Sequence, residues 1–399
     1  MQETDAENTL VLARPYKILV VDDEPDLERL VLQQMRREIR RKQYEFVFAH
    51  NGVEALELLS REPGIDLVVS DINMPKMDGL ALLEKIPDVN ADVRSVIVSA
   101  YGDMKNIRTA MNRGAFDFVT KPIDFADLRV TIERTLRNLI SWREATESRE
   151  KLLAIQNELD VASKMQQSIL PTVFPADSRY QVFGSMSPAR EVGGDFFDIM
   201  KLEEGRIGIA VADVSGKGVP AALFMMSCRT LLKGAAIGTD RPGAVLKEVN
   251  QILQEDNEAM MFVTLFYAIF DPESGKMVYA NGGHNPPIIV KADGSSSEIP
   301  VTSGIALGVM PDMDFVEDSL QVAPGEAVVF YTDGVTEAEN AKAELFDMER
   351  LRMVFNGELP KDAKEANMAV FEAVSAFAGD TPQSDDITCI TLYRCEPCG

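Results

Sequence analysis

The stretch DLVVSD, residues 66–71, is an apolar run that ends on a carboxylate. The same pattern recurs along the chain in three other runs: KILVV (17–21) before Asp22 and Asp23, SVIV (95–98) before Ser99, and DFVT (117–120) before Lys121. Helix-like segments separate these runs, and this alternation over residues 16–124 predicts a parallel sheet with helices on both faces. Because ligands bind beyond the carboxyl ends of such strands, we expect the polar side chains to share one edge.

Carboxylates crowded at one edge repel one another unless a cation lies among them. Oxygen ligands of this kind suit Mg²⁺. An acid beside Mg²⁺, with a lysine and a hydroxyl nearby, is well placed to attack a phosphoryl donor and to hold the product. The sequence therefore predicts a magnesium site and phosphoryl chemistry at this edge.

Four motifs support a family resemblance: VVDDEPD (20–26), VVSDINMPKMDG (68–79), VSAYG (98–102) and FVTKP (118–122). In order and spacing they resemble the receiver domain of two-component response regulators. The resemblance implies a doubly wound α/β domain with a five-stranded parallel sheet over residues 16–140, including its last helix. It further implies that a histidine kinase phosphorylates Asp71. The implied supporting residues are Asp22, Asp23, Asp71 and the Asn73 carbonyl for Mg²⁺, and Ser99 and Lys121 for the phosphoryl oxygens.

The segment that follows predicts one long helix, because residues 125–170 contain neither proline nor glycine. At 1.5 Å per residue such a helix extends on the order of 70 Å. In its second part, apolar residues recur at three- and four-residue steps: Leu152, Ile155, Leu159, Ala162 and Ile169. This spacing is typical of a coiled-coil seam, so we expect a coiled-coil linker over residues 141–172 that forms a parallel homodimer. The alternative is a helix that lies on the next domain.

The second half of the chain places four more acids at the ends of strand-like runs. The segment EVGGDFFDIM (191–200) introduces Asp195, and the others are RIGIAVAD (206–213) with Asp213, AVVFYTD (327–333) with Asp333, and DDITCITLY (385–393) with Asp385. Because alternate strand residues share a face, each acid lies at the rim of an apolar core. Neither cysteine nor histidine stands at ligand spacing, which favours two Mg²⁺ or Mn²⁺ ions. Two such ions activate a hydroxide for displacement at phosphorus.

Five motifs carry a second resemblance: REVGGDFFD (190–198), ADVSGKGVPAAL (212–223), NGGHNPP (281–287), FYTDGVTEA (330–338) and SDDITCI (384–390). They resemble the SpoIIE-like branch of the PPM family of metal-dependent protein serine/threonine phosphatases. The resemblance implies an α+β domain over residues 173–394, built as an αββα sandwich. The implied metal ligands and catalytic acids are Asp195, Asp213 with the Val214 carbonyl, Asp333 and Asp385, with Asp386 left open as an alternative to Asp385. Arg190 corresponds to an arginine that contacts substrate phosphate, although a surface arginine is almost as good an interpretation.

The general acid of this domain stays open. Eukaryotic PPM phosphatases have a histidine two residues after the metal-binding acid, and Ser215 stands at that place here. His284 is one of two histidines in the chain, and it is the candidate substitute because an unperturbed histidine changes charge near neutral pH. The competing interpretation gives His284 a structural hydrogen bond in its glycine- and proline-rich turn. Asp198, on the opposite face of its strand from Asp195, is either a supporting residue or a surface acid.

Composition limits the partners of the chain. Its 40 basic and 64 acidic residues give a net charge of −24, which argues against nucleic acid and anionic membranes. No apolar run approaches ~20 residues, the acidic start MQETDAENTL is unlike a signal peptide, and four cysteines do not make a disulfide scaffold. We therefore expect a cytoplasmic protein. Residues 1–15 and 395–399 are expected to be tails, with Cys395 and Cys398 as reduced thiols.

The two resemblances together imply a response regulator whose output is a protein phosphatase. Phosphate on Asp71 would control the dephosphorylation of a phosphoserine or phosphothreonine, in a STAS-type anti-sigma-factor antagonist. The alternative is a non-catalytic, receiver-controlled adaptor that binds a sigma factor or an anti-sigma partner. An adaptor need not retain the acids, and all four are present, so the sequence favours the enzyme. A DNA-binding regulator is disfavoured by charge and by the absence of a basic recognition helix.

Overall fold

The computed structural model describes residues 14–396, apart from 256, 303 and 357–360. It divides into two units, residues 1–153 and 154–399, and each is considered by itself. Most of the expected N-terminal tail lies outside the described residues, and so does Cys398 of the C-terminal pair. Among the described residues, no helix combines the length and the apolar character that crossing a membrane requires.

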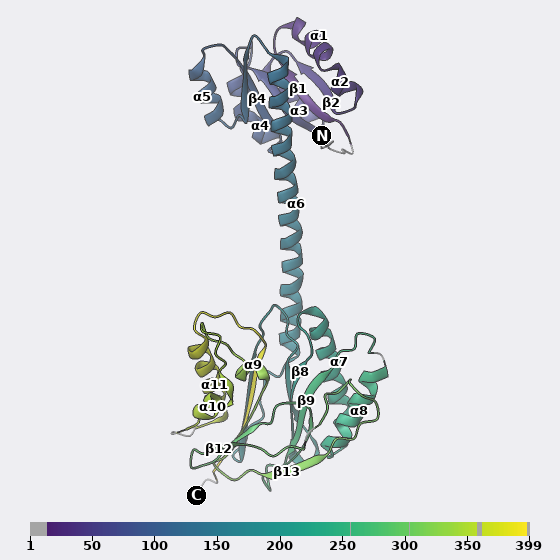
Figure 1. Cartoon of the computed structure of the whole chain (residues 1–399), viewed down its shortest axis with the longest axis vertical. Helices are drawn as coiled ribbons and strands as arrows, with labels where there is room; N and C mark the ends of the chain where they lie inside the picture. The colour runs from purple at the N-terminus through teal and green to yellow at the C-terminus, as the bar shows by residue number, and fades with distance from the viewer. Residues whose placement is uncertain (1–13, 256, 303, 357–360, 397–399) are drawn as a thin grey trace, which may run out of the picture. The chain divides into compact units, whose positions relative to one another are not determined.

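The first unit contains a five-stranded parallel sheet in the order β2-β1-β3-β4-β5, which confirms the sheet predicted from the sequence (Figure 1). The strands are β1 Tyr16–Val21, β2 Tyr44–Ala49, β3 Ile65–Asp71, β4 Arg94–Ala100 and β5 Asp117–Lys121. The helices of this unit are α1 Pro25–Gln34, α2 Arg36–Arg40, α3 Gly52–Arg61, α4 Gly79–Val89 and α5 Met104–Asn112, followed by α6 Phe125–Ile169.

Alternation along the strands gives this sheet two apolar faces. In β1, Ile18 and Val20 pack with side chains of α1 and α6, whereas Leu19 and Val21 pack with side chains of α3 and α4. This follows from the two-residue period of a strand, in which successive side chains point to opposite faces. The sheet is therefore covered on both faces, and only its edges and its strand ends are free to bind a ligand.

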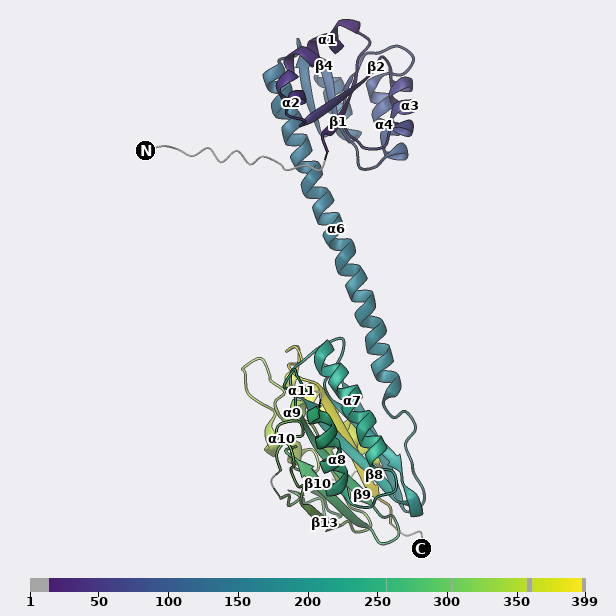
Figure 2. The same cartoon turned by 90° about the vertical axis from the view of Figure 1, so that its right-hand side faces the viewer.

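Helix α6 is continuous over 45 residues (Figure 2). Its first turns bury Leu128, Ile132, Leu136 and Leu139 in the core of the first unit. Further along, Leu152 and Ile155 of the expected seam are 67% and 54% exposed in the single chain. This exposure leaves an apolar stripe that a second copy of the chain is able to cover. The dimer itself stays a prediction.

The second unit contains two five-stranded antiparallel sheets, in the orders β13-β10-β9-β8-β7 and β12-β11-β14-β15-β6. The strands are β6 Tyr180–Ser187, β7 Phe196–Lys201, β8 Ile207–Val214, β9 Val263–Phe270, β10 Lys276–Gly282, β11 Ile288–Val290, β12 Ser296–Glu298, β13 Glu317–Gln321, β14 Ala327–Tyr331 and β15 Ile387–Arg394. The helices are α7 Val219–Ala235, α8 Pro242–Glu255, α9 Asp333–Thr336, α10 Asp347–Met353 and α11 Ala363–Ala378.

The two sheets pack face to face and are covered by helices on their outer faces, so the predicted αββα sandwich is confirmed (Figure 1). Val211 and Phe266 of one sheet meet Phe330 and Ile390 of the other in a shared core. Helices α7 and α8 cover the outer face of the β8 sheet, and α11 covers that of the β15 sheet. This sandwich is the platform that holds the strand-end acids.

Asp198 of β7 is a buried acid rather than a surface one. Its side chain is 1% exposed, and its Oδ2 lies 2.9 Å from Nε of Arg229 and 3.3 Å from Nζ of Lys233, both on α7. A buried carboxylate requires such partners, because an unpaired charge in an apolar layer is very costly. The ion triad therefore fixes α7 against the strand that follows Asp195.

Asp198→Ala should destabilise the second unit by about 3 kcal/mol, because it leaves Arg229 buried without its anion. Far-UV circular dichroism during urea unfolding measures this loss. The fluorescence of Trp142, the one tryptophan of the chain, reports the first unit and should keep its midpoint. Asp314→Ala, which removes an exposed ion pair with Lys247, is the matched control and should change neither signal. An unchanged dichroism midpoint in Asp198→Ala would contradict the role of the triad.

Candidate functional site

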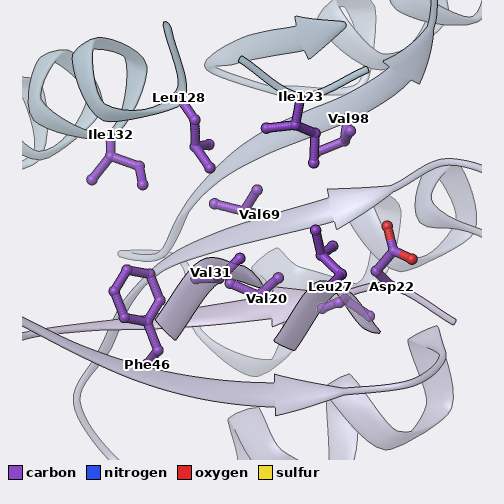
Figure 3. A pocket seen from close by; sticks show the side chains of 11 residues that line it. Val20, Asp22, Leu27, Val31, Phe46, Val69, Val98, Ile123, Leu128 and Ile132 are labelled. Carbon is purple, nitrogen blue, oxygen red and sulfur yellow. The ribbon is translucent and has the colours of Figure 1, made fainter. Parts of the chain in front are cut away.

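The carboxyl ends of three strands bring Asp22, Asp71 and Lys121 together in the first unit. Nζ of Lys121 lies 2.8 Å from Oδ2 of Asp71 and 3.0 Å from Oδ2 of Asp22, and both acids are buried. Carboxylate oxygens of Asp22, Asp23 and Asp71 all lie within 4.8 Å of one another. Figure 3 shows Asp22 beyond the apolar side chains, such as Val20 and Leu128, that fill the layer between the sheet and helices α1 and α6.

The electrostatics of this edge favour a bound cation. Burial raises the pKa of Asp22 above its usual value, so the metal-free carboxylate is held at a cost. Burial alone would lower the pKa of Lys121, but its hydrogen bonds to Asp71 and Asp22 outweigh burial and raise that pKa. Lys121 is thus a permanent cation beside Asp71. The oxygen-only donor set of three acids fits Mg²⁺.

Two further residues expected at this edge have different environments. The hydroxyl of Ser99 is buried and has no hydrogen-bond partner among the described residues. An unpaired buried hydroxyl costs free energy, and a phosphoryl oxygen on the neighbouring strand end would supply the missing partner. Asn73, two residues after Asp71, is exposed on the loop that follows β3. Gly79 is required nearby, since a Cβ there would lie 2.1 Å from the carbonyl oxygen of Asp71.

The second unit brings four acids together from both of its sheets. Asp195 directly precedes β7, Asp213 is the penultimate residue of β8, Asp333 is the first residue of α9 after β14, and Asp385 lies two residues before β15. Each of the other three acids lies close enough to Asp213 to affect its pKa. The sandwich therefore joins four strand ends in one acidic centre. Asp195, Asp213 and Asp333 each lie where the sequence pattern predicts, at a strand end.

Burial and repulsion raise the pKa values of three of these acids, Asp195, Asp213 and Asp333. Burial raises the pKa of Asp213 to about 7, with Asp333 and Asp385 adding repulsion. Burial and the charges of Asp213 and Asp386 raise the pKa of Asp195 well above its normal value. Burial also raises the pKa of Asp333, which faces Glu337 and Asp385. Such a set is unfavourable in its ionised form unless a cation is present.

Two threonines that the sequence pattern did not single out hold Asp195 in place. The hydroxyls of Thr332 and Thr388 each donate to Oδ2 of Asp195 at 2.7 Å. Thr332 directly precedes Asp333, and the backbone amide of Thr388 donates to the Thr332 hydroxyl at 3.0 Å. These bonds tie the end of one sheet to the other across the centre. The signal in the sequence was a threonine close to an acid in both motifs, directly before Asp333 in FYTD and two residues after Asp386 in DDIT.

Asp386 differs from Asp385 in what its carboxylate does. Its Oδ1 accepts from the amide of Ala189 at 2.8 Å, and its Oδ2 accepts from the amide of Gly194 at 2.6 Å. Both carboxylate oxygens of Asp386 are therefore bonded to the backbone segment that leads to Asp195. Asp385 instead makes an ion pair with Lys217, at 2.8 Å from Nζ to Oδ2. The geometry favours Asp385 over Asp386 as the acid available to a metal.

His284 is built into the fold. It is 5% exposed, its Nδ1 lies 2.8 Å from the Thr264 hydroxyl, and its Nε2 lies 3.1 Å from the carbonyl oxygen of Tyr331. Because a carbonyl only accepts, Nε2 carries the proton and Nδ1 accepts from Thr264. Burial lowers the pKa of His284 to about 4, so the ring is neutral near pH 7. This favours the structural interpretation of His284 over a general acid.

Ser215, at the place of the eukaryotic histidine, is also engaged with the backbone. Its hydroxyl accepts from the amide of Phe262 at 2.9 Å, while its own amide donates to the carbonyl of Phe262. Arg190 is exposed on the loop before Asp195, and no ion pair involving it is found among the described residues. Of the two cations in these loops, Lys217 is paired with Asp385, and Arg190 stands five residues before Asp195 in the sequence.

Gln166 of helix α6 holds the loop that carries Asp195 by two hydrogen bonds. Nε2 of Gln166 donates to the carbonyl of Gly193 at 2.6 Å, and its Oε1 accepts from the amide of Gly193 at 3.0 Å. Gln166 is 5% exposed. The next residue, Gly194, lies against the Val214 carbonyl, because a Cβ there would be 3.0 Å from that oxygen. One side chain of α6 thus positions the backbone between two groups of the acidic centre.

The donor chemistry of the second unit fits divalent metals spread over more than one position. Among the described residues, only Asp22, Asp23 and Asp71 gather three donor atoms within 4.8 Å, so the acids of the sandwich are more widely spaced. Two ions about 3.5–4 Å apart need such a wider set of ligands. The raised pKa values favour a bound cation, and the oxygen-only donors fit Mg²⁺ or Mn²⁺ better than Zn²⁺.

Metal should stabilise the second unit more at high pH than at low pH. The pKa of Asp213 is higher in the folded state than in the unfolded state, so protonation of this acid stabilises the metal-free fold. This stabilisation is complete below the unfolded-state pKa of about 4. This contribution is lost as the pH rises through about 7. Because a cation favours the ionised acids, Mn²⁺ at 100 times its Kd should add about 2.7 kcal/mol at pH 8 and much less at pH 5.5.

Thermal unfolding of the full chain, followed by circular dichroism with Mn²⁺ or with a chelator, measures this difference. Asp213→Asn removes one charge without changing the size of the side chain, and it should reduce the metal-dependent increase in Tm at pH 8. Trp142 lies in the first unit, so its fluorescence reports separately the stabilisation that metal gives through the magnesium site there. An equal increase at both pH values would contradict the assignment of these acids to a metal.

Comparison with known proteins identifies both units. The family model for the response regulator receiver domain matches residues 18–133, and that for Stage II sporulation protein E (SpoIIE) matches residues 203–394. Protein IcfG of Synechocystis sp. is 32% identical over 265 residues, which cover 59% of this chain and 41% of IcfG. Phosphoserine phosphatase RsbU of Bacillus subtilis is 28% identical over 272 residues, 68% of this chain and 80% of RsbU.

A solved structure agrees with these matches. The SiaA-PP2C domain of Pseudomonas aeruginosa superimposes with a TM-score of 0.53 at 25% identity. The alignment covers 62% of this chain and 99% of that domain. The fold of the second unit is thus that of a known class of domain.

Proposed function

We propose that this chain, which joins a response regulator receiver domain to a SpoIIE-type PPM phosphatase domain, hydrolyses phosphoserine or phosphothreonine in a protein under the control of Asp71. The observation that carries the proposal is the acidic centre. Asp195, Asp213, Asp333 and Asp385 are all retained at one end of the sandwich, and three of them have raised pKa values. A domain used only for binding would not need to maintain such unfavourable charges.

The residues of the centre divide into metal ligands and groups that position them. Asp213 with the Val214 carbonyl, Asp195, Asp333 and Asp385 would hold two Mn²⁺ or Mg²⁺ ions. When bound, such ions supply an activated hydroxide and stabilise charge on the phosphoryl oxygens. Thr332 and Thr388 orient Asp195, and Asp386 holds the loop before it. Arg190 and Lys217 are the cations placed to attract the substrate phosphate.

In the receiver domain, Asp71 would accept phosphate from a histidine kinase. Asp22, Asp23 and the Asn73 carbonyl would hold Mg²⁺ beside it, and the ion would neutralise charge on the phosphoryl group. Lys121 already lies 2.8 Å from Asp71, so it is placed to bind a phosphoryl oxygen. The unpaired hydroxyl of Ser99 would bind another.

Helix α6 is the element that would connect the two events. It begins in the receiver core with Leu128 and Ile132 and continues to Gln166, which holds Gly193 two residues before Asp195. A change in the receiver that moved α6 would move this loop and so change the acidic centre. The exposed stripe at Leu152 and Ile155 would form the parallel homodimer through which the change passes.

For the substrate we propose a phosphorylated STAS-type anti-sigma-factor antagonist. The support is the resemblance to SpoIIE-like phosphatases and the similarity to RsbU and RsbP of Bacillus subtilis, both named phosphoserine phosphatases. The chain spans 41% of IcfG and 49% of RsbP. The competing function, an adaptor that binds a sigma factor or an anti-sigma partner, does not explain the retained acids.

Asp213→Ala and Asp333→Ala should each reduce Mn²⁺-dependent hydrolysis of a phosphoserine protein by about 10³-fold or more, since several kcal/mol of metal stabilisation are lost. Malachite green detection of released phosphate measures the rate. Asp314→Ala, an exposed acid outside the centre, should keep the rate of the wild type. Circular dichroism confirms that the variants fold. Full activity in either variant of the centre would contradict the proposal.

Asp71→Asn should abolish the effect of a phosphoryl donor on the phosphatase rate, because the acceptor carboxylate is lost. The rates of wild type and variant are compared with and without acetyl phosphate and Mg²⁺. Asp92→Asn, at an exposed position of the same domain, should respond to the donor as the wild type does. In the same assay, Gln166→Leu should accept phosphate normally, yet its rate should no longer respond. A donor response in Asp71→Asn equal to that of the wild type would disprove this control.

A further inference from the structure

A cavity of about 240 Å³ opens beside the acidic centre, between α9 and α11. Its lining includes Gly334 and Ser384, the immediate neighbours of Asp333 and Asp385. A residue bound in this cavity would therefore lie next to a phosphorylated residue at the acids. The cavity is smaller than the ≈ 300–1,000 Å³ of typical small-molecule sites, and its size suits a single side chain.

The walls of the cavity have two chemical characters. One wall is apolar and is formed by Ala338, Phe371, Val374, Ala378 and Ile387. The remaining lining consists of five hydroxyl or amide side chains, two glycines, one proline and one charged residue, Glu339. Glu339 is exposed, and no cation pairs with it among the residues that the structure describes. The lining thus offers a surface for methylene groups and an unpaired carboxylate for a cation.

The cavity is held open by its own hydrogen bonds. The side-chain amide of Gln383 donates to the carbonyl of Ser187 and to the carbonyl of Asp385, both at 2.7 Å. These bonds fix the loop between α11 and β15 against the end of β6. A preformed site of this kind costs less ordering on binding than a flexible loop does.

The charge around the opening indicates the sign of the occupant. Glu337 and Asp380 are exposed acids next in sequence to the lining residues Ala338 and Gly379. Together with Glu339 they outnumber Lys217, which bonds to the carbonyl of the lining residue Ser384 at 2.7 Å and is paired with Asp385. The rim therefore has a net negative charge, which repels an acidic residue and attracts a basic one. Lysine and arginine also place their methylene stems on apolar surface while the charged head stays in water.

We infer that this cavity binds the side chain of a lysine or arginine that lies close to the phosphorylated residue of the substrate protein. The inference rests on the proposed phosphatase function and adds a specificity determinant to it. Phe371 and Val374 pack against the stem, and Glu339 pairs with the cation. The cavity therefore selects among phosphoproteins by the residues that flank the phosphate.

The experiment uses the full chain with Mn²⁺ and a set of phosphoserine heptapeptides. In this set arginine, leucine or glutamate occupies each position from three before to three after the phosphoserine, with alanine elsewhere. At one of these six positions, the peptide with arginine should have a kcat/KM about tenfold above that of the peptide with glutamate at the same position. Glu339→Lys should remove this preference, and Ser375→Tyr, which fills the cavity from α11, should do the same. Glu248→Lys, an exposed change on α8, should leave the preference intact.

A second substrate separates this inference from the proposed function. Hydrolysis of p-nitrophenyl phosphate, which has no flanking residues, should stay within about twofold of the wild-type rate in Glu339→Lys, Ser375→Tyr and Glu248→Lys. Equal rates for arginine, leucine and glutamate peptides, or a preference for leucine that Glu339→Lys leaves unchanged, would overturn the basic-residue site. If the wild type hydrolyses neither kind of substrate, the phosphatase proposal fails. Fluorescence anisotropy with labelled arginine and glutamate peptides then still decides whether the cavity prefers the basic one.

Discussion

Repulsion among buried carboxylates is the constraint on which the rest of the second unit depends. Asp195, Asp213 and Asp333 are held where burial and their acidic neighbours raise their pKa values. The sandwich must therefore supply bonds that hold the acids together against their own charge. Thr332 and Thr388 supply two of these bonds, and His284, fixed between Thr264 and Tyr331, ties together the strand ends beside Asp213 and Asp333.

In the receiver domain, a lysine reduces the repulsion among the buried carboxylates. Lys121 bonds to both Asp22 and Asp71, so one cation partly neutralises the edge before any metal binds. In the second unit, Lys217 pairs with Asp385 alone, and it reaches the centre from an exposed loop. The first arrangement suits a site that must hold a phosphoryl group on its own carboxylate. The second leaves most of the negative charge free for added cations.

The sequence predicted both folds and the strand-end acids, because strand periodicity and strand ends are local features. Residues whose role depends on distant partners were less accessible. Asp198 was left without a role because its partners Arg229 and Lys233 lie on another element. Gln166 bonds to Gly193, 27 residues away, and looked like any polar helix residue. Asp385 and Asp386 are adjacent, and they are distinguished by the backbone amides around Asp386 and by the ion pair of Asp385 with Lys217.

The contact of Gln166 with Gly193 also gives the length of α6 a consequence, because the number of residues sets the rotation of one end of the helix about its axis relative to the other. Each residue added to or removed from an α-helix turns everything beyond it by about 100°. A single-residue change between the receiver core and Gln166 would therefore turn its amide away from Gly193, or would twist the preceding helix by that angle. A change of seven residues nearly restores the phase, because two turns contain about 7.2 residues. Linkers of this kind should vary in length by heptads while keeping their last turns constant.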